Sequence, residues 1–315
     1  MKKVFLLACA VVTFIPWSFA QDQNFYTTSQ ALVNMNPSFA GSNGGIRNQS
    51  LFQTYLSSYA GNYNAYQSST DAYIKQLNAG VALTFAGDYS AGGMFRNNAV
   101  GLAYAQHVSL WGGKMKIIPS LKLSYGSSVF DGGSQFYYTV QQYPWSSATN
   151  VYYMRSNYLD VGAGLLVNYK DKLYVGGSLS HINHPEVASP GTASWYPLPA
   201  MLNLHASYNW QVADRFALHC SGLYQQQAHF YNLRAAANLV SFHHIITGVS
   251  YGSFAMPSVN LGYRNSYFSV TASYTWWRNR GDLIYWGATR IAELGVSVNL
   301  KKKELRTGKG SFESW

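Results

Sequence analysis

The chain has 315 residues, of which 11% are charged and 16% are aromatic, with 26 Tyr and 9 Trp. So few charges at a mean hydropathy near zero are unusual for a soluble enzyme, but they fit membrane strands in which every second residue is polar. The formal net charge is +10, and much of the surplus lies between Lys301 and Lys309. We interpret this cluster as a solvated terminus beside a membrane and expect no nucleic-acid partner.

The chain begins with the features of a signal peptide. Two lysines precede an apolar run over residues 4–15, and small residues close the segment at Ala20. We therefore predict that residues 1–20 direct export and are removed. Cys220 would then be the only cysteine left, so no intrachain disulfide is expected.

Residues 21–45 show no sustained periodicity, and they are predicted to form an N-terminal segment in the periplasm or in the lumen of a barrel. No later stretch approaches the run of about 18 apolar residues that a membrane helix needs. Any membrane residence must therefore use strands in a closed barrel, because lipid cannot satisfy the backbone groups of an open sheet edge.

About 14 segments between residues 46 and 300 alternate apolar and polar side chains, which is the pattern of strands. In the clearest one, from Tyr267 to Trp276, the even-numbered residues are apolar and the odd-numbered residues carry hydroxyl groups. Hydroxyls in place of Lys and Glu favour lipid on one side and a polar lumen on the other. The predicted fold is all-β: a transmembrane antiparallel β-barrel of about 14 strands over residues 46–300, followed by a basic C-terminal tail over 301–315.

The connections alternate in length, as they do in outer-membrane barrels with short periplasmic turns and longer outer loops. Tight turns are predicted at 111–113, 170–172, 213–214 and 265–266, and long outer loops at 126–156, 183–199 and 277–289. The alternation is imperfect, because two expected outer loops, at 226–228 and 252–256, are short.

The loop predicted over residues 126–156 is rich in aromatic rings and poor in charge, a composition that protein-binding surfaces favour. One interpretation is that these rings bind a protein partner. The other is that they fold over the barrel mouth and pack on each other or on Trp195, Tyr196, Tyr285 and Trp286. The candidate partner-binding residues are Tyr137, Tyr138, Tyr143, Trp145, Tyr152 and Tyr153.

Residues with catalytic or metal-binding chemistry are present but poorly arranged. The pairs His181/His184 and His243/His244 have spacings that place the two rings on opposite faces of a strand. His205 and His219 are expected to face the lumen with serines, as polar residues of any barrel interior do. We therefore predict no enzyme activity, no metal and no cofactor. Charged residues expected inside the barrel, as pairs that plug or brace it, are Asp160, Arg234, Arg264, Arg290 and Glu293.

Several short motifs follow one another in a characteristic order along the chain after the predicted signal peptide. They are Asn36-Pro37-Ser38-Phe39-Ala40-Gly41, Ala72-Tyr73-Ile74 followed by Gly80, Tyr104-Ala105-Gln106-His107, Leu159-Asp160-Val161-Gly162-Ala163-Gly164, Tyr174-Val175-Gly176-Gly177-Ser178-Leu179-Ser180-His181 and the region of Gln225-Gln226-Gln227. In order and spacing they resemble the PorP/SprF family of outer-membrane proteins of the type IX secretion and gliding systems of Bacteroidetes. The closing strand departs from the usual pattern of barrels, because it ends at Leu300 without a terminal aromatic residue.

This resemblance implies a non-enzymatic component of the outer membrane that delivers or holds secreted surface proteins, often large adhesins. Its implied partners are outer-membrane lipid, an adhesin-like secreted protein and periplasmic secretion or motility components. The resemblance also singles out Asn36, Pro37, Phe39, Ala40 and Gly41 as family motif residues. The alternative from another functional class is a diffusion channel or substrate-specific transporter. An open, charge-lined lumen would favour the transporter, and a filled lumen the secretion component.

Overall fold

The computed structural model describes residues 25, 30–56, 63–90, 93–131, 153–188, 195–253, 256–277 and 289–300. The strands are, in chain order, β1 (Ile46–Leu56), β2 (Tyr63–Ile74), β3 (Ala79–Ser90), β4 (Phe95–Gln106), β5 (Val108–Leu110), β6 (Met115–Asp131), β7 (Tyr153–Tyr169), β8 (Leu173–Ser180), β9 (Glu186–Ala188), β10 (Trp195–Pro197), β11 (Met201–Ala213), β12 (Phe216–Gln227), β13 (Phe230–Ser241), β14 (Ile245–Gly252), β15 (Met256–Arg264), β16 (Phe268–Trp277) and β17 (Thr289–Asn299). Short helices are α2 (Leu32–Met35), η2 (Pro37–Phe39), η3 (Lys75–Leu77) and η5 (Trp111–Gly113).

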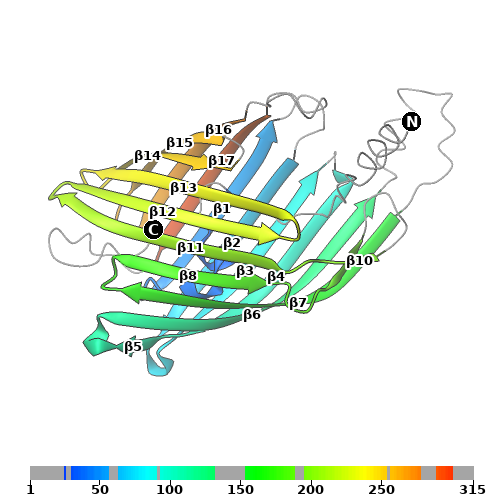
Figure 1. Ribbon diagram of the computed structural model, residues 1–315, viewed down its shortest axis with the longest axis horizontal. Coiled ribbons are helices and arrows are strands. Elements are labelled where there is room, and N and C mark those ends of the chain that lie inside the picture. Colours follow the sequence, from blue (N-terminus) through cyan, green and yellow to red (C-terminus); the bar gives the residue numbers. More distant parts are fainter. Residues whose placement is uncertain are drawn as a thin grey trace, which may run out of the picture.

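The strands form one closed antiparallel barrel (Figure 1). Each main strand pairs with its neighbour in the chain, and β1 closes the barrel by pairing with β17 from Arg47↔Asn299 to Leu56↔Arg290. The short β5 continues β4 after His107 and pairs with β6, so the closed wall has 14 strands. The predicted barrel of about 14 strands is therefore confirmed.

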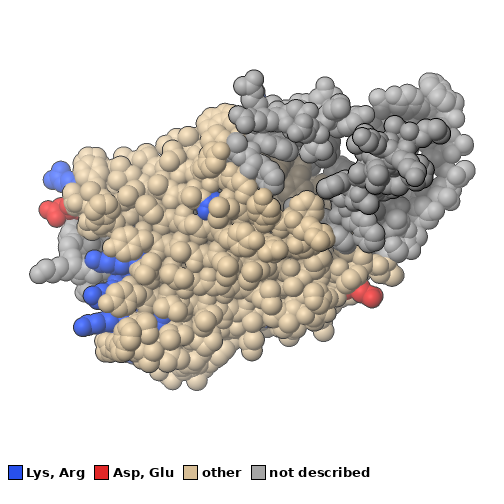
Figure 2. Space-filling model, viewed as in Figure 1, with Lys and Arg blue, Asp and Glu red and all other residues tan. Residues whose placement is uncertain are grey.

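The two faces of the wall differ as the sequence alternation predicts. In β16, Thr271, Ser273 and Thr275 are buried toward the lumen, whereas Phe268 and Trp276 are exposed on the outside. The same alternation recurs around the barrel, so that large apolar side chains cover its outer surface. Figure 2 shows an almost uncharged wall on the visible face, with Lys and Arg gathered at the end that carries the tight turns. This is the surface of a lipid-facing barrel.

The connections separate into a tight-turn end and a long-loop end, at opposite ends of the barrel. Predicted turns such as those near 170–172 and 265–266 join strands directly. The loop predicted over 126–156 is shorter than expected, because β6 extends to Asp131 and β7 begins at Tyr153. Alternation continues through these extensions, with Ser128 and Ser156 buried on the lumen side. The predicted loop over 183–199 contains a small hairpin, β9 with β10.

The described part of the N-terminal segment lies inside the barrel. Phe25 packs with Leu51 and Ala65 of β1 and β2, and the chain from Gln30 to Gly45 then crosses the lumen toward the tight-turn end. We call residues 30–45 the plug. Within the described residues, no helix is long and apolar enough to cross a membrane.

Candidate functional site

The plug is shaped by its motif Asn36–Gly41. Asn36 has an extended backbone, and its Oδ1 accepts the N–H of Ser38 at 2.9 Å, which caps η2. Pro37 occupies the first position of η2, where its missing N–H costs nothing. With Oδ1 directed at the N–H of Ser38, the side-chain amide of Asn36 places its nitrogen, Nδ2, against the barrel wall.

The Asn36 amide is held between three strands. Its Nδ2 lies 3.2 Å from the carbonyl oxygen of Leu165 on β7 and 3.1 Å from that of Gly177 on β8. These two residues face each other in the β7–β8 ladder. Nδ2 also lies 2.9 Å from Nε2 of His205 on β11, which accepts a hydrogen bond when that nitrogen carries no proton. Two amide hydrogens are thus shared among three acceptors, and all of Asn36 is buried.

Glycines make the space for this contact. A Cβ on Gly164 would lie 2.2 Å from Oδ1 of Asn36, and a Cβ on Gly176 would lie 2.9 Å from Nε2 of His205. Either side chain would displace the plug or the histidine, since atoms do not pack at such distances. The glycines of β7 and β8 therefore form a socket for Asn36.

The remaining motif residues make further contacts with the barrel wall. Ser38 Oγ lies 2.8 Å from Ser120 Oγ on β6, and the Phe39 ring centroid lies 5.2 Å from that of His205. The carbonyl oxygen of Ala40 is 2.9 Å from Nε2 of His107.

At Gly41 the plug backbone approaches the wall directly. Gly41 has a φ of 69°, in the region that favours glycine, and a Cβ on it would lie 2.6 Å from the Cα of Gly80 on β3. Its N–H donates to Oδ2 of Asp71 on β2 at 2.8 Å. Plug and wall therefore meet backbone to backbone at these two glycines.

A buried ion pair anchors the same region. Arg47 on β1 places Nε 2.9 Å from Oδ1 of Asp71, and the two side chains are 2% and 0% exposed. Arg47 Nη2 also lies 3.3 Å from the carbonyl oxygen of Phe39 in the plug. Neither residue was predicted from the sequence to belong to the site. Their positions on the inward faces of the first two strands are the signal that would have found them.

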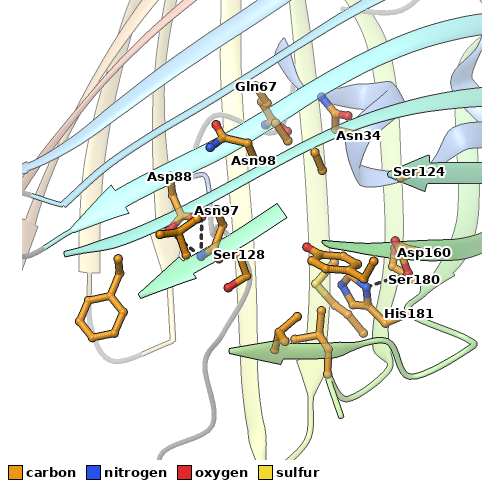
Figure 3. Close-up of a pocket in the computed structure, with 18 of the residues that line it drawn as sticks. Asn34, Gln67, Asp88, Asn97, Asn98, Ser124, Ser128, Asp160, Ser180 and His181 are labelled. Carbon is orange, nitrogen blue, oxygen red and sulfur yellow. Dashed lines mark hydrogen bonds and ion pairs between the residues drawn. The ribbon is translucent and has the colours of Figure 1, made fainter. Parts of the chain in front are cut away.

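On the long-loop side of the plug the lumen holds a cavity of about 190 Å³, which is lined by both polar and apolar side chains (Figure 3). Two hydrogen-bonded pairs line it: Asn97 donates to Asp88 at 3.3 Å, and Nδ1 of His181 lies 2.9 Å from Oδ1 of Asp160. Asn34 of the plug also lines it. The cavity is therefore bounded by the plug on one side and by polar and apolar wall residues around it.

Of the five charged residues predicted to lie inside the barrel, four face the lumen and one faces outward. Asp160 contacts His181, Glu293 accepts Ser273 Oγ at 3.0 Å, Arg264 Nε donates to the carbonyl of His243 at 3.2 Å, and Arg234 is buried. The inward prediction for Arg290 is wrong. Arg290 is exposed and lies opposite the outward-facing Trp276, because it shares its face of β17 with Leu294.

Of the predicted partner-binding residues, Tyr137, Tyr138, Tyr143, Trp145 and Tyr152 lie outside the described residues. Tyr153 begins β7 and is 61% exposed. In the other interpretation the loop packs on four further rings. Of these, Trp195 is exposed and Tyr196 lines the cavity, whereas Tyr285 and Trp286 lie outside the described residues. No group of three or more His, Cys, Asp or Glu side chains converges as a metal site in the part of the chain that is described.

Residues 18–284 match the family described as type IX secretion system membrane protein PorP/SprF. Among solved structures, the CymD monoaromatic hydrocarbon channel aligns with a TM-score of 0.51 at 13% identity, covering 88% of this chain and 94% of CymD. The toluene transporter TodX of Pseudomonas putida gives a TM-score of 0.49 at 12% identity, with coverages of 87% and 94%. Omp33 of Acinetobacter baumannii gives 0.43 at 9% identity, with coverages of 81% and 98%. No curated protein matches the chain significantly.

Proposed function

The chain belongs to the PorP/SprF family of type IX secretion system membrane proteins, and from this premise we propose that it assists the secretion or surface attachment of large cell-surface proteins such as adhesins. It is an outer-membrane β-barrel. In this role it performs no chemistry of its own. It gives a secreted protein a fixed partner in the membrane.

The observation that carries this proposal is the plug. Residues 30–45 occupy the lumen and hold wall residues on both sides of it, from Asp71 on β2 to His205 on β11 and Ser269 on β16. A diffusion channel needs a continuous aqueous path, whereas a docking or anchoring component does not. A lumen that the plug crosses therefore supports the secretion role over an open diffusion channel.

The alternative is a channel for a small solute, and the cavity beside the plug is the observation that favours it. CymD is itself named as a hydrocarbon channel, but the likeness at 13% identity concerns the fold alone. The two functions differ in conductance. Purified protein in planar bilayers is expected to show no stable open level, and a steady ohmic conductance at low voltage would favour the channel.

The secretion role is tested by deleting the gene and shaving intact cells with protease. The proteins released from wild-type cells and missing from the deletion strain are the surface proteins that depend on this barrel. We expect at least one large surface protein in this set, restored by the wild-type gene. An unchanged set of surface proteins would reject the proposal.

The aromatic loop is the proposed docking surface for the secreted protein. It contains Tyr137, Tyr138, Tyr143, Trp145 and Tyr152, and it leads into Tyr153. Shortening the loop between Ser134 and Ala148 is expected to leave a folded barrel and to reduce display of the dependent proteins. Normal display by the shortened variant would reject this surface.

The opposite end of the barrel supports contact with periplasmic components. Its tight turns carry exposed cations and few acids, and Figure 2 shows Lys and Arg atoms gathered at this end of the visible face. Exposed cations in or beside these turns are Lys75, Lys114, Lys170, Lys172 and Arg215. A basic rim of this kind attracts acidic protein surfaces in the periplasm.

A further inference from the structure

One edge of β7 lacks a strand partner over its outer half. β7 has 17 residues and pairs along its whole length with β6 on one side. On the other side β8 has only 8 residues and pairs with β7 from Ala163 to Tyr169. Within the described ranges no strand pairs with this edge between Tyr153 and Gly162.

The direction of the free backbone groups follows from the hydrogen bonds at the end of β8. The N–H and C=O of Val161 and the C=O of Leu159 all point toward the β8 side. Alternate residues of an antiparallel strand direct their N–H and C=O groups to the same edge. The β6–β7 register shows no bulge, so the groups of Arg155 and Asn157 point to this edge too.

The side chain of Asn183 makes the hydrogen bonds of a neighbouring strand at one position of this edge. Its Oδ1 accepts the N–H of Val161 at 3.0 Å, and its Nδ2 donates to the carbonyl of Leu159 at 2.7 Å. A side-chain amide thus makes the two bonds that a peptide group of a neighbouring strand would make. The next groups along the edge, those of Asn157 and Arg155, have no such surrogate in the described structure.

A surface groove of about 690 Å³ runs along this edge. The β9–β10 hairpin lies against β7 here (Figure 1), and Ser156 Oγ donates to the carbonyl of Glu186 at 2.7 Å. Two aromatic side chains, Tyr125 and Trp195, and the aliphatic side chain of Leu159 line the groove. An exposed cation, Arg155, and an exposed anion, Glu186, line it as well.

We propose that an extended segment of the secreted protein binds this groove by adding as a strand to the open edge of β7. The inference rests on the proposed function, which supplies the secreted protein. An extended polypeptide carries N–H and C=O groups at the spacing of the edge, and its alternate side chains would contact Leu159 and Trp195. A lipid acyl chain fits less well, because it would cover the N–H and C=O of Asn157 without satisfying them.

The test removes one backbone hydrogen-bond donor from the open edge. Asn157→Pro removes the N–H that points to the open edge and leaves the β6 ladder intact, because that N–H does not face β6. Asn157→Ala is the matched control, since it removes the same side chain and keeps the N–H. Both full-length variants are expressed in the deletion strain, and the amount of folded barrel is read from heat-modifiable mobility of outer-membrane protein.

Display of the proteins missing from the deletion strain is then measured by protease shaving. We expect Asn157→Pro to reduce it by about fivefold or more at equal folded barrel, the change that follows from losing one hydrogen bond, and Asn157→Ala to match wild type. If Asn157→Pro lowers the folded barrel itself, Arg155→Pro replaces it, with Arg155→Gln as its control.

Normal display with the proline variant would overturn strand addition while leaving the proposed function in place. Equal losses with the proline and alanine variants would also overturn it, because contact would then run through the side chain. A deletion strain with unchanged surface proteins would reject the proposed function itself. It would then also reject the secreted protein as the ligand of this edge.

Discussion

Asp71 links the first two strands of the barrel to the plug through its two carboxylate oxygens. Oδ1 lies 2.9 Å from Nε of Arg47, and Oδ2 accepts the N–H of Gly41 at 2.8 Å. The carboxylate is fully buried, so neither contact is shared with solvent. Wall and plug thus depend on the same side chain.

Replacing Asp71 with Ala is expected to lower the free energy of unfolding by about 3–5 kcal/mol, because it leaves the Arg47 guanidinium buried beside no carboxylate. Urea titration followed by heat-modifiable mobility measures the change. The double variant Arg47→Met/Asp71→Leu is the control, and it should regain much of the loss. Equal unfolding midpoints for Asp71→Ala and wild type would contradict this account of the pair.

Gly80→Ala is expected to push the plug away from the wall. Its Cβ would lie 1.9 Å from the carbonyl oxygen of Ala40. The backbone fixes the position of the Cβ and the carbonyl is part of the backbone, so neither rotates away. We expect a loss of about 1–3 kcal/mol in stability and an increase in single-channel conductance in planar bilayers. Gly222→Ala is the control, because its Cβ would come no closer than 3.8 Å to the atoms of the neighbouring strands. Identical conductance for the two variants would show that Gly80 does not position the plug.

Depth in the membrane is tested on one strand. Leu204 and Val212 both face outward on β11, but Val212 lies next to the tight turn at the strand end. Leu204→Arg is expected to cost about 2–4 kcal/mol, and Val212→Arg about 0–1 kcal/mol, because the cost of a cation falls toward the interface. Unfolding in detergent and refolding into lipid vesicles measures both. Equal costs would contradict the difference in membrane depth between the two residues.

Orientation is tested by thiol labelling of whole cells. The single cysteine predicted to remain, Cys220, faces outward from β12 and is first replaced by Ala. Glu186→Cys, at the long-loop end, is expected to react with an impermeant maleimide. Lys172→Cys, at the tight-turn end, is expected to react only after the outer membrane is permeabilised. The reverse pattern would invert the barrel.

The wall was predictable from sequence because a lipid-facing strand imposes a strict period of two on its side chains. The alternation over residues 268–276 is enough to identify β16 and its two faces. The same rule explains the error at Arg290, which was placed by its charge although its position in the alternation puts it outside with Leu294. Near the strand end an outward Arg reaches the headgroup region, so the charge is tolerated there.

The site was less predictable, because its contacts join residues far apart in the chain. The motif Asn36–Gly41 is visible in the sequence, but nothing local connects Asn36 with His205, which lies 169 positions later. The socket is formed by missing side chains at Gly164 and Gly176, and glycines in strands also occur at bulges and at tight bends of a barrel wall. The open edge of β7 was also hidden, because sequence alternation does not show where a neighbouring strand stops.

The plug also spans the seam where the first and last strands meet. Gln30 reaches Ser269 on β16 and Asn43 reaches Asn299 on β17, while Gly41 is held by Asp71 on β2 and the chain continues from Gly45 into β1. Contacts on both sides of a seam exist together only after it has closed, so their free energy favours closure over the separate hairpins. The N-terminal segment therefore stabilises the pairing of β1 with β17, because separating these two strands would also break its contacts.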